Sequence, residues 1–157
     1  MKHVKHSIIA GLLCLAVILS LAGCVTGKGS GEGVTAAEPQ DVLWTLLDAD
    51  TDTLKALCSE SMELSSAKDF VKTCKQKEKK VSATFLNPHE KDAGRFSKEY
   101  ASLADGEQFV WFKTFRPLDE KWTSPSESDF LAEGYLILKE NPSTKKLYVV
   151  RLAAIAV

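Results

Sequence analysis

Three short helices are predicted between residues 39 and 80, because apolar residues recur there every three or four positions. The first helix spans Pro39–Ala49. The second follows the run Asp50-Thr51-Asp52, whose side chains can cap a helix N-terminus. The third begins at Ser65-Ser66 and ends in the basic run Lys75–Lys80, where cations suit the helix dipole. The apolar faces consist of Val42, Leu43, Leu46 and Leu47, then Leu54, Leu57 and Cys58, and then Phe70, Val71 and Cys74.

The pattern changes after Lys80 to aromatic and β-branched residues, which favour strands. The turn-forming run Asn141-Pro142-Ser143-Thr144 joins the last two strand segments and predicts an antiparallel hairpin. Residues Arg95–Leu103, between the first two segments, fit either a helical turn or a loop. The order predicts an α+β domain, with N-terminal helices packed on a curved antiparallel sheet of about four strands. The predicted strands are Val81–Leu86, Glu107–Phe115, Phe130–Lys139 and Lys146–Val157.

The N-terminus has the form of an export signal. Lys2 and Lys5 precede the apolar run Ser7–Ser20, and no acidic residue accompanies them. A transmembrane helix over Ser7–Gly23 is the competing interpretation, because its length is near the ~17 residues at the lower end of the spanning range. The polar, glycine-rich sequence that follows favours the signal, because a retained span usually has interfacial aromatic or basic residues on its outer side.

The tetrapeptide Leu21-Ala22-Gly23-Cys24 resembles the bacterial lipobox. The resemblance implies that the Cys24 thiol receives a diacylglycerol, that a peptidase cuts before it, and that the new amino group is often acylated too. Several acyl chains make attachment durable, because each buried methylene contributes about 0.8 kcal/mol. Val25 follows in place of Asp, which by the same resemblance favours the outer membrane, facing the periplasm. The predicted divisions are a signal peptide over residues 1–23, a flexible, glycine-rich tether over 24–40 and an α+β globular domain over 41–157.

Cysteine use in the mature domain predicts a disulfide. Cys58 and Cys74 form an even pair in a compartment that permits oxidation, and two buried free thiols are the alternative. A metal site is not indicated, because His89 is the only mature histidine and the sequence has no CxxC spacing.

Charge and motifs argue against two classes of function. The chain has 20 basic and 21 acidic residues, and loss of Lys2 and Lys5 with the signal leaves 18 basic against 21 acidic. This balance argues against a protein that coats nucleic acid. The sequence has no GxSxG, no HExxH and no glycine-rich phosphate loop, so neither an enzyme nor a bound cofactor is predicted.

The stretches WTLLDADTDTLKALCSES (residues 44–61) and ADGEQFVWFKTF (residues 104–115), with the hairpin Leu131–Leu152, suggest a fold family. They resemble the cone-shaped nuclear-transport-factor-2-like (cystatin-like) fold as used in small bacterial lipoproteins. That family has a helix, an Asp-containing break and a second helix ending near a Ser, followed by a sheet with long central strands. Some of its members are isomerases with a pocket Asp and Tyr, and the resemblance implies Tyr100, Tyr135 and Asp129 as counterparts.

The aromatic segment Phe109–Phe115 is apolar at both odd and even positions. Such a strand buries both faces, or buries one and offers the other to a ligand or partner. The second interpretation makes Trp111 or Phe112 part of a mostly apolar pocket on the concave face of the sheet. Trp122, in a polar loop, is either a contact residue or a local lid. Tyr135, on the next predicted strand, is the fourth candidate for ligand binding.

These features predict a non-enzymatic outer-membrane lipoprotein whose periplasmic domain binds a partner protein or a small apolar ligand through the face of its sheet. One alternative is an immunity or exclusion lipoprotein that blocks a toxin or phage component, where the acidic residues Glu127 and Asp129 would suit a basic partner. Another is an isomerase-like enzyme of the cone fold. A closed apolar pocket with a buried carboxylate would favour the enzyme.

Overall fold

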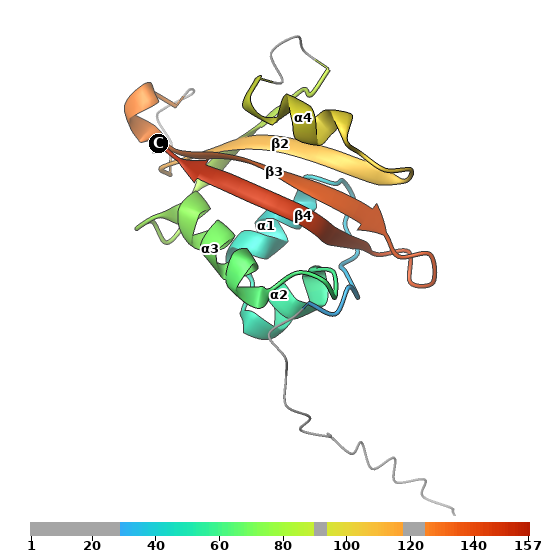
Figure 1. The fold of residues 1–157 in the computed structure, drawn as a ribbon. Helices are drawn as coiled ribbons and strands as arrows, with labels where there is room; N and C mark the ends of the chain where they lie inside the picture. Colours follow the sequence, from blue (N-terminus) through green and yellow to red (C-terminus); the bar gives the residue numbers. More distant parts are fainter. Residues whose placement is uncertain (1–28, 90–93, 118–124) are drawn as a thin grey trace, which may run out of the picture.

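The computed structural model describes residues 29–89, 94–117 and 125–157. Within these residues the chain forms four α-helices, two single 3₁₀ turns and a sheet of four strands. Helices α1, α2 and α3 lie on one face of the sheet, and the short helix α4 lies on the other (Figure 1). The bounds are α1 Asp41–Asp48, α2 Thr51–Leu57, α3 Leu64–Lys75, β1 Ser82–Leu86, α4 Ser97–Ala101, β2 Glu107–Phe115, β3 Phe130–Glu140 and β4 Leu147–Ala156, with 3₁₀ turns at Gly94–Phe96 and Glu127–Asp129.

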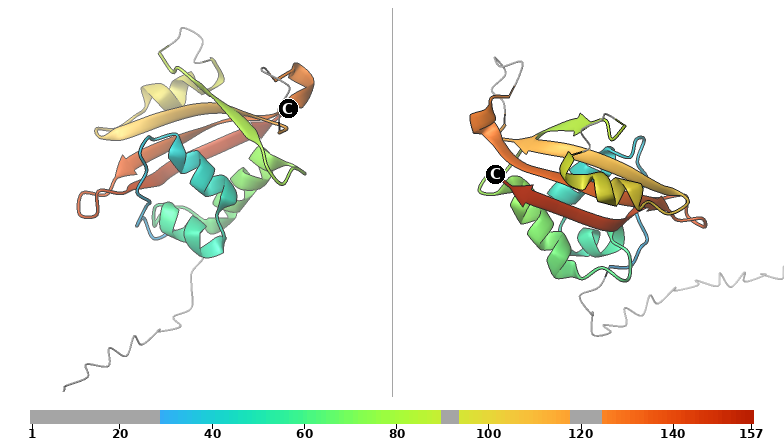
Figure 2. Two further views of the ribbon diagram at one scale, coloured as in Figure 1. Left: turned by 180° about the vertical axis from the view of Figure 1, so that it is seen from behind. Right: turned by 45° about the horizontal axis from the view of Figure 1, so that its top comes forward.

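The sheet is antiparallel throughout and follows chain order, β1-β2-β3-β4. Figure 2 shows its strands from two further sides, with the helices packed across them. The β3–β4 turn is organised by Asn141, whose side-chain oxygen accepts hydrogen bonds from the backbone N–H groups of Ser143 (2.9 Å) and Thr144 (3.2 Å). The α+β class, the helices before the sheet and the antiparallel C-terminal hairpin are therefore confirmed.

A local cap satisfies the start of α2, and a contact between distant residues satisfies the end of α1. The Asp50 carboxylate accepts a hydrogen bond from the Thr53 backbone N–H at 2.8 Å, so it caps α2 as predicted, and this bond lowers the pKa of Asp50. At the C-terminus of α1, the Lys75 ammonium donates to the Leu47 carbonyl at 3.2 Å. The cation thus satisfies an unpaired carbonyl of α1 from the end of α3, which ties the two helices together.

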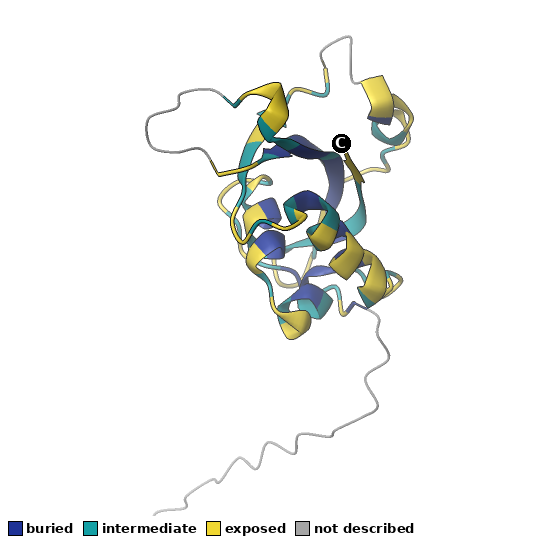
Figure 3. Cartoon of the chain, turned by 90° about the vertical axis from the view of Figure 1, so that its left-hand side faces the viewer, coloured by how far each residue is buried: buried dark blue, intermediate teal, exposed yellow. Residues whose placement is uncertain are grey.

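The main core lies between the sheet and helices α1 to α3. Figure 3 shows buried residues gathered where the helices face the sheet and exposed residues on the outer sides. Phe112 of β2 is fully buried there, and its ring meets Phe70 of α3 edge-on at 5.9 Å between centroids. Thr114 is also fully buried, and its hydroxyl donates to the Cys74 carbonyl at 2.8 Å, which joins the last turn of α3 to β2.

A second, smaller cluster lies on the opposite face of the sheet, under α4. It consists of Phe96, Trp111, Tyr135 and Ile137, with partly buried neighbours around them. Because successive side chains of a strand point to opposite faces, β2 places Trp111 in this cluster and Phe112 in the main core. Burial on both sides explains why apolar residues occupy both odd and even positions from Phe109 to Phe112.

Residues 29–34 are packed against the folded domain, and we call this segment the strap. The Gly29 N–H donates to the Met62 carbonyl at 3.0 Å, and Val34 exchanges two backbone hydrogen bonds with Leu147 of β4, at 2.8 and 2.9 Å. The prediction of a flexible tether is therefore wrong for the strap, where the glycines allow close backbone approach. Of the rest of the predicted tether, residues 24–28 lie outside the described residues, and residues 35–40 lead into α1 with Ala36 packed against the main core.

The predicted disulfide between Cys58 and Cys74 does not form, and both thiols are free and buried. Cys58 bridges to Val149, which pairs with Leu138 of β3. Cys74 lies at the other end of the sheet, because its carbonyl accepts from Thr114, which pairs with Ala132 of β3. The six residue steps from Ala132 to Leu138 span about 20 Å along the strand. A disulfide needs Cα atoms within about 7 Å, so this architecture excludes it.

Both thiols should therefore resist alkylation in the folded protein. Burial raises the pKa of Cys58 to about 11 and that of Cys74 to about 12. A rise from 9.0 to about 11 lowers the thiolate fraction near pH 8 by about 100-fold. Peptide mass spectrometry after iodoacetamide treatment should find Cys58 and Cys74 modified in urea and unmodified without it.

The same pKa values predict how stability depends on pH. Above about pH 9 the unfolded chain releases thiol protons that the folded chain retains, so the free energy of unfolding should fall as pH rises from about 9 to 11.

The control for the alkylation experiment is the variant Thr84→Cys, which places a thiol at an exposed position of β1 and should be alkylated rapidly in the folded protein. Rapid alkylation of native Cys58, or a linked Cys58–Cys74 peptide, would contradict this account.

Candidate functional site

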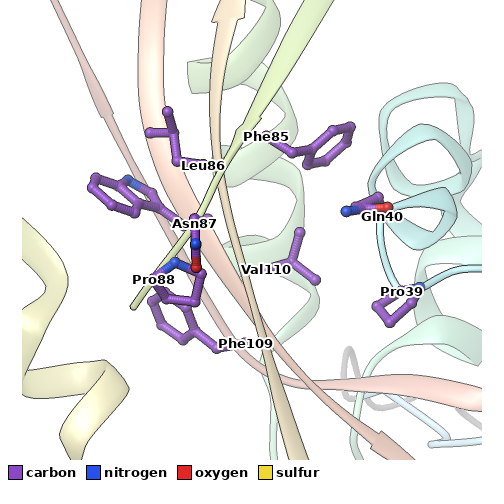
Figure 4. A pocket seen from close by; sticks show the side chains of 9 residues that line it. Pro39, Gln40, Phe85, Leu86, Asn87, Pro88, Phe109 and Val110 are labelled. Carbon is purple, nitrogen blue, oxygen red and sulfur yellow. The ribbon is translucent and has the colours of Figure 1, made fainter. Parts of the chain in front are cut away.

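A cleft of about 370 Å³ opens where β1 ends, and we call it the β1 cleft. Figure 4 shows that Phe85 and Val110 point toward Pro39 and Gln40 at the start of α1, whereas Leu86 and Phe109 lie on the other side of the strands. Seven of its nine lining residues are aromatic or aliphatic, and Gln40 and Asn87 carry amide side chains. The lining consists of Pro39 and Gln40, residues 85–88 and residues 109–111.

The cleft exists because β1 stops before β2 does. Leu86, the last residue of β1, pairs with Trp111 of β2. Pro88 has no N–H to donate to a ladder, and it restricts the backbone of Asn87 before it. The Asn87 side-chain oxygen accepts from the His89 backbone N–H at 3.0 Å, which turns the chain. The start of β2 is thereby left to form one wall of the cleft beside α1.

Trp111 is held in a fixed orientation at the floor of the β1 cleft. Its indole N–H donates to the Glu133 carboxylate of β3 at 2.9 Å, and only 8% of the residue is exposed. The hydrogen bond satisfies the polar end of the indole, so the remaining ring surface is free to pack against apolar groups. Trp111 therefore lies at the cleft, and its role in ligand binding stays a prediction.

A row of aromatic rings continues from the cleft to α4. Phe109, which lines the cleft, stacks on Tyr135 with centroids 5.4 Å apart, and Tyr100 of α4 meets Phe109 edge-on at 5.5 Å. The Tyr100 hydroxyl lies 2.9 Å from His89 Nδ1, and the two groups share a hydrogen bond. Contacts with Tyr135 and with Tyr100 of α4 hold the Phe109 ring in place, so this wall of the cleft is preformed.

A titratable pair lies under α4, behind the aromatic row. Burial raises the pKa of Tyr135, and the Glu99 carboxylate raises it further. One carboxylate oxygen of Glu99 is buried and has no hydrogen-bond partner among the described residues. Arg151, which lowers the pKa of Tyr135, is held by Glu107 at 3.3 Å and by the Ser102 hydroxyl at 3.2 Å. None of these four charged or phenolic groups lines the β1 cleft.

The structure separates the four residues predicted to bind a ligand. The prediction is wrong for Phe112, which is fully buried in the main core on the other face of the sheet and cannot line a pocket. Tyr135 does not line the cleft; it stacks on Phe109, which does, and 8% of the residue is exposed. Trp122 lies outside the described residues, as does Cys24, the predicted site of lipidation.

The residues implied by the isomerase resemblance do not converge. Tyr100 and Tyr135 are joined through Phe109 on the α4 side of the sheet. Asp129 belongs to a separate 3₁₀ turn, where it accepts hydrogen bonds from the Ser126 hydroxyl at 2.6 Å and backbone N–H at 3.1 Å. These bonds lower the pKa of Asp129. A lowered pKa is expected for a carboxylate that caps a turn and not for a general base.

Pro39, Gln40 and Phe85 are cleft residues that the sequence patterns did not indicate as a site. Pro39 and Gln40 carry only the signal of a helix start, and Phe85 reads as an ordinary strand residue. The run Asn87-Pro88 marks a strand end, which is the feature that opens the cleft. No cluster of three or more metal-ligating side chains occurs in residues 29–89, 94–117 and 125–157.

Two further observations bear on identity. Among the helices that the structure describes, none is long and apolar enough to cross a bilayer. Searches with the chain against protein-family models, curated proteins and solved structures return no match.

Proposed function

We propose that the protein is a non-enzymatic lipoprotein, anchored in the outer membrane through Cys24, that binds an uncharged apolar group of a partner protein or small molecule in the β1 cleft. The proposed binding site is this cleft alone and not a whole face of the sheet. α1 to α3 cover one face and α4 packs on part of the other, so the cleft at the end of β1 is the better candidate.

The observation that carries the proposal is the composition of the cleft. Seven of the nine described residues that line it are aromatic or aliphatic and none is charged, while polar and apolar atoms contribute about equally to its exposed surface. The amides of Gln40 and Asn87 can each donate and accept a hydrogen bond without adding charge. Pockets of this size and composition suit apolar ligands oriented by a few polar contacts.

The anchor part of the proposal rests on the lipobox Leu21-Ala22-Gly23-Cys24 and on the basic and apolar segments before it. Acyl chains on Cys24 would attach the domain to the membrane without a spanning helix. The resemblance to the nuclear-transport-factor-2-like fold is compatible with this assignment, since that family is used in small bacterial lipoproteins.

The test uses Nile red, an uncharged apolar dye, as the probe. We expect saturable fluorescence enhancement with the wild-type protein, and at least about tenfold weaker binding, equivalent to 1.4 kcal/mol, when Gln40→Glu and Asn87→Asp are combined. Both changes keep the size of the side chain but place a charge where an apolar ligand would desolvate it. Gln108→Glu adds the same charge at an exposed site of β2 outside the cleft and should bind the dye normally. Equal dye binding by the double variant and by wild type would refute the site.

A further inference from the structure

The strap is fixed to the domain by glycines that other residues could not replace. Gly33 has φ +73°, and a Cβ at this position would overlap the Leu147 carbonyl oxygen. A Cβ at Gly29 would likewise overlap the Cys58 carbonyl oxygen. Between them, the Gly31 N–H donates to the Cys58 carbonyl at 2.6 Å, and the Gly33 N–H to the Ala56 carbonyl at 2.8 Å. The segment is therefore bound backbone to backbone along its length.

The strap and the β1 cleft lie at opposite edges of the sheet. Val34 bridges to Leu147 and Cys58 bridges to Val149, both on the outer side of β4. The cleft is formed at the other edge, where β1 separates from β2. In Figure 1 the strap, coloured blue, lies beside α2, on the side of the sheet away from α4.

The reach of the chain limits how the domain can turn. Five residue steps separate Cys24 from Gly29, and a fully extended chain covers at most about 18 Å over that distance. Cys58, on which Gly29 packs, lies one strand spacing outside β4, so β1 is four spacings away, or about 19 Å. The straight path between the two edges alone takes up the whole reach of a fully extended chain, and the real path is longer because it must pass around the domain.

We propose that the strap turns the β4 edge and α2 toward the anchoring membrane and holds the β1 cleft toward the aqueous space. The occupant of the cleft then reaches it from the water-exposed side, and is not drawn from the bilayer that carries the anchor. This inference rests on the proposed lipidation of Cys24, and it adds the orientation of the site and the source of its ligand.

Orientation is measured on the full-length lipidated protein in phospholipid vesicles whose headgroups carry a spin-label quencher. A fluorophore is attached at Glu60→Cys, beside the strap, or at Thr84→Cys on β1, both of which are exposed positions. We expect several-fold stronger quenching at position 60 than at position 84. Equal quenching at the two positions would overturn the proposal.

A spacer variant tests whether the strap causes the asymmetry. Insertion of about 15 Gly and Ser residues between Lys28 and Gly29 adds a flexible length of about 20 Å while the strap itself stays intact. The difference in quenching between positions 60 and 84 should then largely disappear. If the difference persists, a surface of the domain binds lipid by itself, and the strap is not what orients the cleft.

Hydrogen exchange tests the strap independently of the membrane. Amides of Gly29, Gly31 and Gly33 should exchange at least about 100-fold more slowly than in an unstructured peptide. Gly33→Ala should abolish most of this protection. Gly31→Ala is the matched control, because Gly31 also has positive φ, +68°, but its nearest neighbours leave a Cβ 3.8 Å of room. Unprotected amides in the wild-type protein would overturn the proposal.

Lipidation is scored separately, by palmitate labelling of wild type and Cys24→Ser. Labelling of the wild type alone supports the anchor. Absence of label in both would reject the anchor and with it the membrane orientation, while the exchange results would still report whether the strap is docked.

Discussion

Replacement of Phe112 by Ala is expected to lower the free energy of unfolding by about 3–5 kcal/mol, because it removes a fully buried ring from the main core. Phe112 is among the largest side chains without solvent exposure, and it packs edge-on against Phe70 of α3. The loss therefore combines the transfer of the ring to water with a cavity between β2 and α3. Urea denaturation followed by circular dichroism measures it.

The control for this prediction is Trp44→Ala. Trp44 is also a large aromatic side chain, but it is 37% exposed on α1 and meets only the edge of Phe85 at 6.2 Å. Its removal should lower the free energy of unfolding less than Phe112→Ala does, because more than a third of the residue stays exposed. A loss below about 1 kcal/mol for Phe112→Ala would contradict its place under α3. Such a result would return Phe112 to the candidates for ligand binding.

Gly134→Ala is expected to destabilise the domain by about 1–3 kcal/mol through overpacking. Gly134 pairs with Phe112 in the sheet. A Cβ there would lie 2.5 Å from the Ala153 carbonyl oxygen and 2.8 Å from the tip of the Phe112 ring. The backbone of β4 and the aromatic ring must both shift to admit one methyl group, and the same denaturation experiment measures the effect.

A double-mutant cycle distinguishes this mechanism from a general loss of packing. Leucine is shorter than phenylalanine, so Phe112→Leu should relieve the contact with the new Cβ at position 134. The double variant should then be more stable than the sum of the two single losses predicts, by at least about 0.5 kcal/mol. Strict additivity would show that Phe112 does not press on position 134, and the proposed contact would be wrong.

The order of elements could be predicted from the sequence because each has a strong local signal. Helical spacing of leucines, the Asp50 cap and the Asn141 turn all act over a few residues, and the structure contains each of them. The strap could not be predicted in this way. A glycine-rich segment predicts a flexible chain when only its neighbours in sequence are considered. Gly33 is instead required because the backbone of Leu147, more than a hundred residues away, approaches it closely.

The candidate site was predictable only in part, for a related reason. Trp111 and Phe112 are adjacent in one strand and point to opposite faces, so the main core encloses Phe112 while Trp111 lies at the cleft. Which face carries the helices is decided by packing, not by the strand's own pattern. The approach of Gln40 to the end of β1 likewise depends on how α1 is placed, and no local signal records it.

The backbone groups that the strap occupies have a consequence for solubility. Leu147 bonds to Val34, and the Val149 carbonyl accepts from the Ser59 N–H at 2.8 Å, so the start of the outermost strand is already paired. An unpaired strand of this kind is a template on which other chains can add and aggregate. The strap and α2 thus also cover the start of this sheet edge and make it less available for self-association.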